Sequence, residues 1–525
     1  MNKNLFNTLP KAPITNTVNE AGGKAYQRSS QEALAQHALT GCLGNTFYVK
    51  AETQLQTTLQ LIGQCSPEFV AKLAVYARTK GYMKDMPATL LAAISTPDNT
   101  ELVKRVFERV INNGKMLRNY VQVLRSGVTG RKSLGSAYRN LVRGWIYECS
   151  AEELIAASVG NTPSLADIIK MVHPKPTDRS VSALLAYILG KASPEDWQVM
   201  PSIVQQLENF RKDPMYQIPV LATFELLTST PLTTQHWIAI AQNAGWQMLR
   251  MNLNTFLRNG VFKHPEATEM ITAKLKDYTA AKRARIMPYQ ALTSYLFVDK
   301  EVPMKVRNAL QDILDLSLKN IPKLDGKIVV CPDVSGSMGS PITGSRGSAT
   351  TKMRCIDIAA LIAAALLKTN EDTMVLPFDT RLHTNSMNPR DSLATLTTTL
   401  AKYGGGGTYT ALPLKYLVQQ KIYPDVIVYI SDNESWVTGP IRSFPSAATS
   451  TETMVAFTEI KRHNRKAKMV CIDLTPTTSV QAPSTQSEIL NVGGFTDNVF
   501  DVIANFTKEG WSPDFWVRDI EKIEL

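Results

Sequence analysis

Hydrophobic positions in the first 324 residues recur at the three-and-four spacing of amphipathic helices. Leu55, Leu59 and Ile62 follow this spacing, and apolar runs of the β-strand type are nearly absent before Lys327. Pairs of a hydroxyl residue and a proline precede several helical runs, as at helix starts where the hydroxyl is the N-cap and proline occupies the first turn. The pairs are Ser66-Pro67, Thr162-Pro163, Ser193-Pro194 and Thr230-Pro231. The pattern predicts an all-helical region up to residue 324.

The spacing of these prolines indicates how the helices are arranged. Pro163, Pro194 and Pro231 are 31 and 37 residues apart, and Pro265 follows 34 residues later. Unequal spacings of this size in helix-only sequence favour stacked helix pairs, an α-solenoid of the HEAT type. An irregular helical domain with unrelated helix starts is the alternative.

The pattern changes at Lys327. The apolar run from Ile328 to Cys331 predicts a buried parallel strand, and a second such run extends from Asp425 to Ile430. A glycine-rich loop, residues 404–407, lets backbone segments approach closely before a helix expected from Ala411. The sequence therefore predicts a doubly wound α/β domain over residues 325–525, after a helical domain over residues 1–324.

Polar side chains follow the two predicted strands where each strand ends, at the edge where open α/β sheets bind ligands. The five residues in question resemble the metal-ion-dependent adhesion site of von Willebrand factor A domains: Asp333, Ser335, Ser337, Thr408 and Asp432. Few carboxylates with several hydroxyls suit a hard divalent cation, and Mg²⁺ in particular. The alternative is a simple Asx-type turn that caps the helix expected near Met353.

Composition excludes several classes of protein. Apolar residues make up 44% and charged residues 20%, as in globular proteins, and the longest uncharged apolar run, Ile358 to Leu367, is half a membrane span. The amino terminus lacks the apolar core of a signal peptide, so we expect a cytoplasmic location and no membrane partner. The six cysteines are scattered without a Cys-x-x-Cys pair and indicate reduced core residues.

Charge separates the two parts of the chain. Residues 1–324 hold 38 Lys and Arg against 25 Asp and Glu, whereas residues 325–525 hold 19 against 21. Ten basic residues and one acid, Glu108, lie between Lys104 and Arg143. Gly127, Gly130 and Gly135 interrupt this block, unlike a membrane-binding amphipathic helix, so a nucleic acid is the favoured polyanion. The candidate contacts are Arg131, Lys132, Arg139, Arg143, His173, Lys175, Arg283 and Arg285.

Catalysis is not predicted. Ser337, Asp432 and His463 follow the chain order of an α/β-hydrolase triad, but position 335 is serine where the nucleophile motif needs glycine. A two-metal nuclease needs more clustered acids than Asp333, Asp432 and Glu434 provide.

Two further stretches, His173 to Pro176 and Ala284 to Tyr289, together with Asp333 to Met338, give the chain a resemblance to the Ro ribonucleoprotein (TROVE-domain) family, in its bacterial branch. The resemblance implies a monomeric ring of HEAT-like repeats closed by a von Willebrand factor A domain. It implies small noncoding Y-type RNA on the basic outer surface and misfolded RNA with single-stranded 3′ ends in a central hole. It also implies a 3′-to-5′ exoribonuclease tethered through the RNA.

The resemblance matches His173 and Lys175 to a Y RNA contact. The segment just before it departs from the family pattern, since residues 156–161 carry no basic side chain, which shifts the expected contact toward Arg131, Lys132, Arg139 and Arg143. Two functions therefore stay open: a non-catalytic RNA-binding protein of RNA quality control, and a metal-dependent protein-adhesion module with the helical part as its scaffold.

Overall fold

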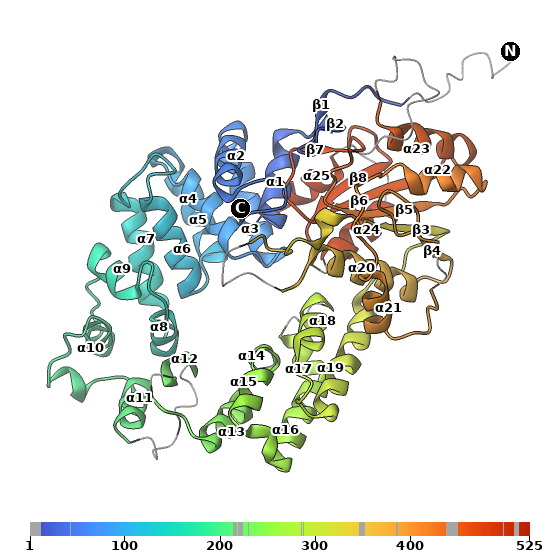
Figure 1. Ribbon diagram of the computed structural model, residues 1–525. Helices are drawn as coiled ribbons and strands as arrows, with labels where there is room; N and C mark the ends of the chain where they lie inside the picture. The colour runs from blue at the N-terminus through green and yellow to red at the C-terminus, as the bar shows by residue number, and fades with distance from the viewer. Residues whose placement is uncertain are drawn as a thin grey trace. The chain divides into compact units, whose positions relative to one another are not determined.

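The chain forms two compact units, which we call the helical unit and the sheet unit (Figure 1). This computed structural model describes residues 12–41, 44–213, 218, 224–228, 230–284, 286, 288–345, 352–384, 387–436, 450–496, 498–508 and 514–525. The helical unit comprises Val70–Ile286 and Gln290–Leu316. The sheet unit comprises the described residues up to Phe69, Pro288 and Tyr289, and Ser317–Glu524.

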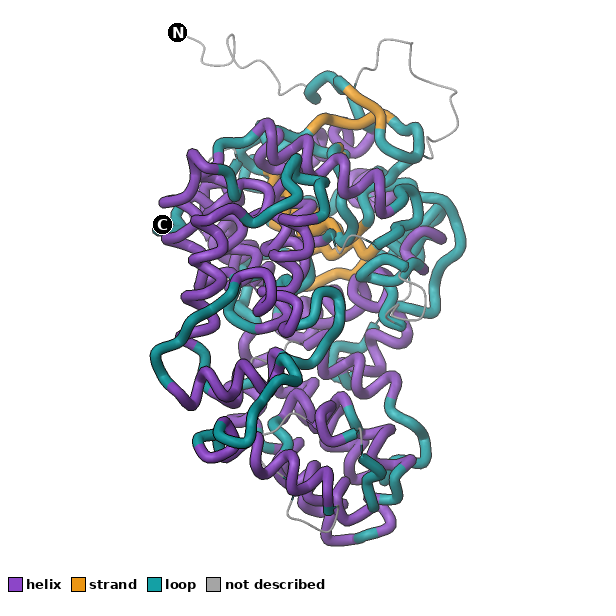
Figure 2. Tube along the Cα trace, turned by 90° about the vertical axis from the view of Figure 1, so that its left-hand side faces the viewer, coloured by secondary structure: helices purple, strands orange, loops and turns teal. Residues whose placement is uncertain are grey.

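The helical unit is built from α-helices and short 3₁₀ turns, with no strand among its described residues (Figure 2). Its core contains large side chains that are almost fully buried, such as Tyr120, Tyr138, Phe210 and Phe256. No helix in the described part of the chain is both long and apolar enough to cross a membrane. The helices from the start of this region are α3 (Pro67–Thr79), α4 (Asp85–Ile94), α5 (Thr100–Val110), α6 (Gly114–Arg125), α7 (Gly135–Glu148), α8 (Ala151–Ala157), α9 (Leu165–Val172), α10 (Arg179–Ile188), α11 (Ser202–Lys212), α12 (Phe224–Leu227), α13 (Thr234–Asn243), α14 (Trp246–Met251), α15 (Leu253–Arg258), α16 (Pro265–Lys276), α17 (Tyr278–Arg283), α18 (Pro288–Phe297) and α19 (Met304–Ser317).

Only some of the proline-marked helix starts are where the sequence predicts them. Pro67 begins α3 and Pro265 begins α16. Two other pairs precede the true N-caps: Ser164 caps α9 and Thr233 caps α13, each by accepting a hydrogen bond from the third residue of its helix. Ser193-Pro194 precedes only a 3₁₀ turn, Asp196–Gln198. A hydroxyl two or three residues further along competes for the same cap, which the proline pattern does not reveal.

The sheet unit contains a parallel sheet of five strands in the order β4-β3-β5-β6-β8. Four of the strands, β3, β5, β6 and β8, are buried at every position, as expected for a parallel sheet with helices on both faces. The bounds are β3 (Ile328–Pro332), β4 (Thr373–Val375), β5 (Val426–Ser431), β6 (Lys468–Asp473) and β8 (Ile489–Gly493).

Alternate strand residues point to opposite faces and pack against different helices. Val329, Ile427 and Met469 share a core cluster with Leu414 of α22 (Leu412–Gln419) and Phe457 of α23 (Glu452–His463). Helix α20 (Cys355–Thr369) contacts β3, β4 and β5 but contributes nothing to that cluster, so it covers the other face. The remaining helices of this unit are α21 (Leu393–Leu400), α24 (Asn498–Lys508) and α25 (Phe515–Glu521).

The amino-terminal residues belong to the sheet unit by contact, although the sequence analysis grouped them with the helices. Strands β1 (Thr17–Val18) and β2 (Lys24–Gln27) form a small antiparallel sheet with β7 (Ser479–Val480). Helix α1 (Ser30–Thr40) packs on β8, next to α2 (Ala51–Gln64). Two short strands of this kind carry no period long enough to be recognised in the sequence.

Candidate functional site

Two carboxylates lie side by side at the carboxyl edge of the parallel sheet. Asp333 follows β3 and Asp432 follows β5, and these strands pair in register with Pro332 opposite Ile430. The amide of Asp333 donates to the carbonyl of Ile430 at 2.9 Å. Both side chains are almost fully buried, with exposures of 0% and 3%. The strand pairing that the apolar runs predict thus brings the two acids together.

Three hydroxyls complete the predicted set. The amide of Ser335 donates to Asp333 Oδ1 at 2.8 Å, and the hydroxyls of Ser335 and Ser337 are 3.2 Å apart. The glycine loop is bonded to the same turn, since the amide of Gly336 donates to the carbonyl of Gly406 at 2.9 Å. This loop ends at Thr408, whose Oγ1 is buried without a hydrogen-bond partner.

The electrostatics of this edge favour a cation. Burial and then the charge of Asp432 raise the pKa of Asp333 to about 7. Burial also raises the pKa of Asp432, although a hydrogen bond from Ser337 acts to lower this pKa. Two close buried carboxylates and an unpartnered hydroxyl are stabilised by a hard divalent ion, which takes oxygen ligands. The donor set therefore fits Mg²⁺.

The fit depends on hydroxyl oxygens rather than on acids alone. Among the described residues, no group of three or more His, Cys, Asp and Glu side chains forms a metal-binding cluster. Asp333 and Asp432 would hold the cation together with the hydroxyls of Ser335, Ser337 and Thr408.

Three further residues at this edge are not among the five predicted ligands. The Ser431 hydroxyl donates to Asp333 Oδ2 at 2.6 Å. Glu434 is 1% exposed, and its Oε1 has no partner. Tyr48, from the amino-terminal part of the sheet unit, interacts with the Ser337 hydroxyl. Ser431 and Glu434 are close to Asp432 in the sequence, so their place at this edge could be predicted from it. Nothing in the sequence near Tyr48 indicates the contact with Ser337.

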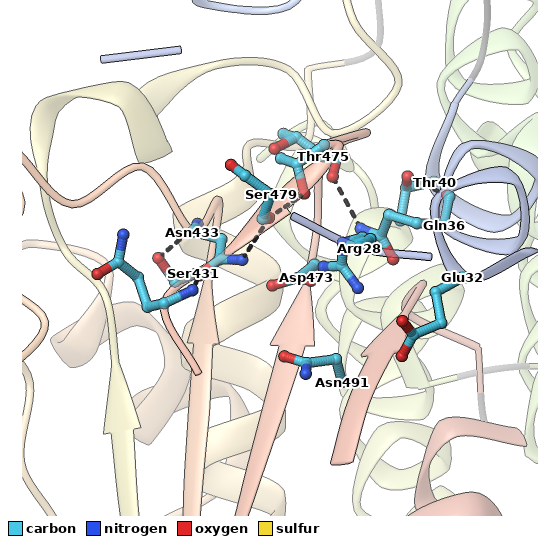
Figure 3. Close-up of polar contacts among 12 residues, drawn as sticks. Arg28, Glu32, Gln36, Thr40, Ser431, Asn433, Asp473, Thr475, Ser479 and Asn491 are labelled. Carbon is cyan, nitrogen blue, oxygen red and sulfur yellow. Dashed lines mark hydrogen bonds and ion pairs between the residues drawn. The ribbon is translucent and has the colours of Figure 1, made fainter. Parts of the chain in front are cut away.

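A network of buried polar side chains holds the neighbouring loops of the same edge (Figure 3). Arg28 forms an ion pair with Asp473 at the end of β6. The Gln36 amide donates to the carbonyl of Thr475 at 2.9 Å. Asn433 donates its backbone amide to the Ser431 hydroxyl at 2.9 Å and its side-chain amide to the carbonyl of Ser479 at 3.1 Å. Asn433 therefore fixes the loop that carries Asp432 to β7, while Arg28 and Gln36 fix the end of β6 and the loop after it to the amino-terminal segment.

Four of the basic candidates in the helical unit lie on or beside α7 and the end of α9. Arg143 donates from its side chain to the carbonyl of Val172, the residue before His173. His173 ends α9 in the left-handed conformation, with φ of 50°. The amide of Lys175 donates to the Tyr147 hydroxyl at 2.7 Å. Arg139 lies one turn before Arg143 on α7. The structure thus joins residues 139–147 and 173–175 into one surface, which we call the α7/α9 surface.

The α7/α9 surface also contains an aromatic residue, Tyr147, that is not among the predicted RNA contacts. Tyr147 is 43% exposed beside the exposed residues His173 and Lys175. Exposed aromatic rings next to cations are the usual platform for an unpaired base. The prediction of RNA contacts used only the basic residues. A tyrosine at the end of a helix has no sequence pattern that indicates its exposure.

Arg131 and Lys132 differ in their surroundings. The Arg131 guanidinium donates to the carbonyls of Ser95 and Leu134 and lies 5.1 Å from the centre of the Tyr138 ring. Lys132 is exposed. Arg131 therefore serves the packing of the helical unit, whereas Lys132 is directed to solvent.

The remaining candidates are on other elements. Arg283 is exposed at the last position of α17, which packs against α14 and α16 rather than α7. Arg285 lies outside the described residues.

Three comparisons place the chain among known proteins. Residues 327–507 match the family described as the Ro60 vWA domain. The RNA-binding protein RO60 of Deinococcus radiodurans is 24% identical over 532 aligned positions, which cover 93% of this chain and 95% of that protein. The chain is thus similar to Ro60 proteins along nearly its whole length, and residues 327–507 are similar to their vWA domain. The crystal structure of the Deinococcus radiodurans RO (RSR) protein is similar, with 19% identity and a TM-score of 0.60 over 91% of this chain and 99% of that chain, which shows a shared fold.

The helical unit also contains a cavity of about 510 Å³ between α6, α7 and α8. Lys115 and Arg118 line it, but so do four acids. The acids are Glu108, Glu148, Glu153 and Glu225. Desolvation and then the carboxylate of Glu108 raise the pKa of Glu148. Because the lining carries these acids, the cavity is unsuited to a phosphate.

Proposed function

We propose that this chain is a non-catalytic RNA-binding protein. One observation carries the proposal: the charge excess lies entirely in residues 1–324, with 38 basic against 25 acidic residues, and exposed cations meet an exposed aromatic ring on the α7/α9 surface. Lys and Arg that neutralise phosphates release counterions, and a ring adds stacking for bases. The relationship to a curated RNA-binding protein over 93% of the chain supports the same class of partner.

The α7/α9 surface is proposed as the contact for small noncoding Y-type RNA. His173 and Lys175 supply exposed polar and cationic groups, Tyr147 supplies the stacking face, and Lys132 and Arg283 are further cationic contacts. Misfolded RNA with a single-stranded 3′ end is proposed as the second ligand. In that proposal the HEAT-like helices close into a monomeric ring with the von Willebrand factor A domain, and only an unpaired end passes the central hole.

These two ligands give the protein a role in RNA quality control in the cytoplasm. Y-type RNA would tether a 3′-to-5′ exoribonuclease, while the ring would select RNA by the presence of a free unpaired end. Selection of this kind reads shape and strandedness rather than sequence, as is usual for RNA.

A divalent cation, Mg²⁺, is proposed at Asp333, Ser335, Ser337, Thr408 and Asp432. When bound, it supplies positive charge that offsets the two buried carboxylates. The alternative function, adhesion of a protein partner through an open position on this metal, has less support, because the room beside Ser337 and Asp432 is about 10 Å³.

The RNA proposal is tested by binding of a structured RNA with and without a single-stranded 3′ tail, at several salt concentrations. We expect Lys175→Glu and Tyr147→Ala each to weaken binding about tenfold, since stacking and charge-assisted phosphate contacts contribute about 1 to 3 kcal/mol each. Lys402→Glu, the same charge change at an exposed site of the sheet unit, is the matched control. The logarithm of the affinity should fall with the logarithm of the salt concentration.

Equal affinity of the wild type and both helical-unit variants would reject the α7/α9 surface. A protein freed of nucleic acid that binds no RNA at low salt would reject the function itself.

A further inference from the structure

The sheet unit contains a cavity of about 140 Å³ that none of the five predicted metal ligands lines. Its lining comes from residues 23–24 at the start of β2, residues 409–411 before α22, and residues 450–453 at the start of α23, together with Trp436. A single water molecule needs about 10 to 15 Å³. The cavity therefore has room for a group of roughly ten non-hydrogen atoms, which is the size of one nucleobase.

Trp436 presents a large aromatic ring at this cavity from a fixed backbone. Its side chain is 52% exposed. Its amide donates to the carbonyl of Thr408 at 3.3 Å, and a Cβ added at Gly23 would lie 3.1 Å from the Trp436 Cα, so the backbone is held from two sides. An exposed ring of this kind is a platform on which an unpaired base stacks.

Buried hydroxyls add polar groups to the same cavity. The hydroxyl oxygens of Thr410 and Thr453 are 2.8 Å apart, and the two residues are 4% and 3% exposed. The amide of Thr410 donates to the Ser435 hydroxyl at 3.3 Å, which fixes this wall to the residue before Trp436. A hydroxyl can donate one hydrogen bond and accept two, so the pair can meet donors or acceptors on the edge of a base.

The charges of the cavity suit an anion better than an amine. Glu452 is its one acid among the described residues, and Lys415 donates to Glu452 Oε2 at 2.5 Å. The Lys415 ammonium also lies 5.1 Å from the centre of the Tyr409 ring, so the place that a cationic ligand would take beside Tyr409 and Glu452 is filled by this chain. Lys24, which is exposed, supplies a positive charge for a phosphate.

We propose that this cavity binds one unpaired nucleotide of RNA, with the base against Trp436 and the phosphate at Lys24. The proposal rests on the proposed RNA-binding function and deepens it, because it gives the sheet unit an RNA contact of its own. Residues 325–525 carry 19 basic against 21 acidic residues, so the contact depends on stacking more than on charge. A base inside a duplex is stacked on its neighbours and does not reach the ring.

The test follows tryptophan fluorescence of the full-length protein during titration with a short single-stranded oligoadenylate, since a base stacked on the indole quenches it. We expect Trp436→Ala to lose this quenching and to weaken binding about tenfold. Trp436→Phe should also lose the quenching but keep the affinity within about threefold, because a ring remains for stacking. The matched control is Trp197→Ala, at an exposed tryptophan of the helical unit, which should keep the affinity. Lys175→Glu, on the α7/α9 surface, should keep the quenching.

Salt dependence separates the two parts of the contact. Lys24→Ala should reduce the slope of log affinity against log salt by about 0.7, the value for one phosphate of a single strand, whereas Trp436→Ala should leave the slope unchanged. Lys402→Ala, at an exposed lysine of the sheet unit, is the control for Lys24. The oligoadenylate annealed to its complement should cause no quenching.

Wild-type quenching and affinity in Trp436→Ala would overturn the proposal. If the wild type binds a structured RNA with a 3′ tail but its fluorescence ignores the oligoadenylate, the RNA-binding function stands and only this inference falls. If the wild type binds neither RNA at low salt, both fall.

Discussion

Arg28 and Asp473 form an ion pair in which neither side chain meets solvent, with exposures of 0% and 2%. Asp473 ends β6, and Arg28 follows β2. The pair therefore joins two residues that are 445 positions apart in the sequence. The guanidinium bonds Asp473 through Nη2, and its buried Nε and Nη1 have no hydrogen-bond partner. Among the described residues, Asp473 is thus the one hydrogen-bond partner of the Arg28 guanidinium.

Removing one member of this pair should destabilise the sheet unit strongly. We expect Arg28→Met to lower the free energy of unfolding by about 3 to 5 kcal/mol, because it leaves the Asp473 carboxylate buried and unpaired. Hydrogen exchange of the β5 and β6 amides across a denaturant series measures this for the sheet unit alone. Arg462→Met, at the exposed pair with Glu459, should cost less than about 1 kcal/mol. Similar losses in both variants would contradict the structural role of Arg28.

The buried His37 should make the sheet unit sensitive to acid. Burial and then the charge of Arg28 lower the pKa of His37 to about 4, from an ordinary value near 6.5. The unfolded chain therefore binds the extra proton first, and stability is lost as the pH falls from about 6.5 toward 4. The loss approaches about 3 kcal/mol at the lower end.

Thermal unfolding at a series of pH values measures this effect. His37→Asn should flatten the pH dependence in that window, whereas His463→Asn, at an exposed histidine, should leave it as in the wild type. An unchanged slope in His37→Asn would show that other groups govern the acid response.

Mg²⁺ should stabilise the protein through the five-residue site. Binding to the folded state alone adds about 2.7 kcal/mol at a concentration one hundred times the dissociation constant. We expect a rise in melting temperature with Mg²⁺ for the wild type and none for Asp333→Ala or Thr408→Ala. Asp372→Ala, at an exposed carboxylate of the same unit, should respond like the wild type. A full response in Asp333→Ala would place the ion elsewhere.

Arg131 and Lys132 should respond differently to charge reversal. Arg131→Glu removes guanidinium hydrogen bonds to the carbonyls of Ser95 and Leu134, so it should lower the melting temperature as well as RNA affinity. Lys132→Glu, at an exposed side chain, should weaken RNA binding and leave the melting temperature unchanged. Differential scanning calorimetry and filter binding of a structured RNA separate the two effects. Wild-type affinity in Lys132→Glu would exclude that lysine as a contact.

The parallel sheet and the closeness of Asp333 and Asp432 could be predicted because they depend on short, local patterns. An apolar run followed by Asp333, and another followed by Asp432, suffices, since parallel strands place their carboxyl ends at the same edge. The helical region was equally apparent from its period. The exact helix starts could not be predicted, because Ser164 and Thr233, rather than Thr162 and Thr230, are the N-caps.

The sequence by itself determined the two classes of secondary structure, the segregation of positive charge into the first 324 residues, and the position of Asp333 and Asp432 after two strands. Only the tertiary structure decided that the amino-terminal segment packs on the sheet, with Ala21 at Glu434 and Tyr48 at Ser337. It also decided that Arg131 is used for packing while Tyr147 faces solvent. The physical reason is that contacts between residues hundreds of positions apart leave no period in the sequence, because they arise only when separate elements bury their surfaces together.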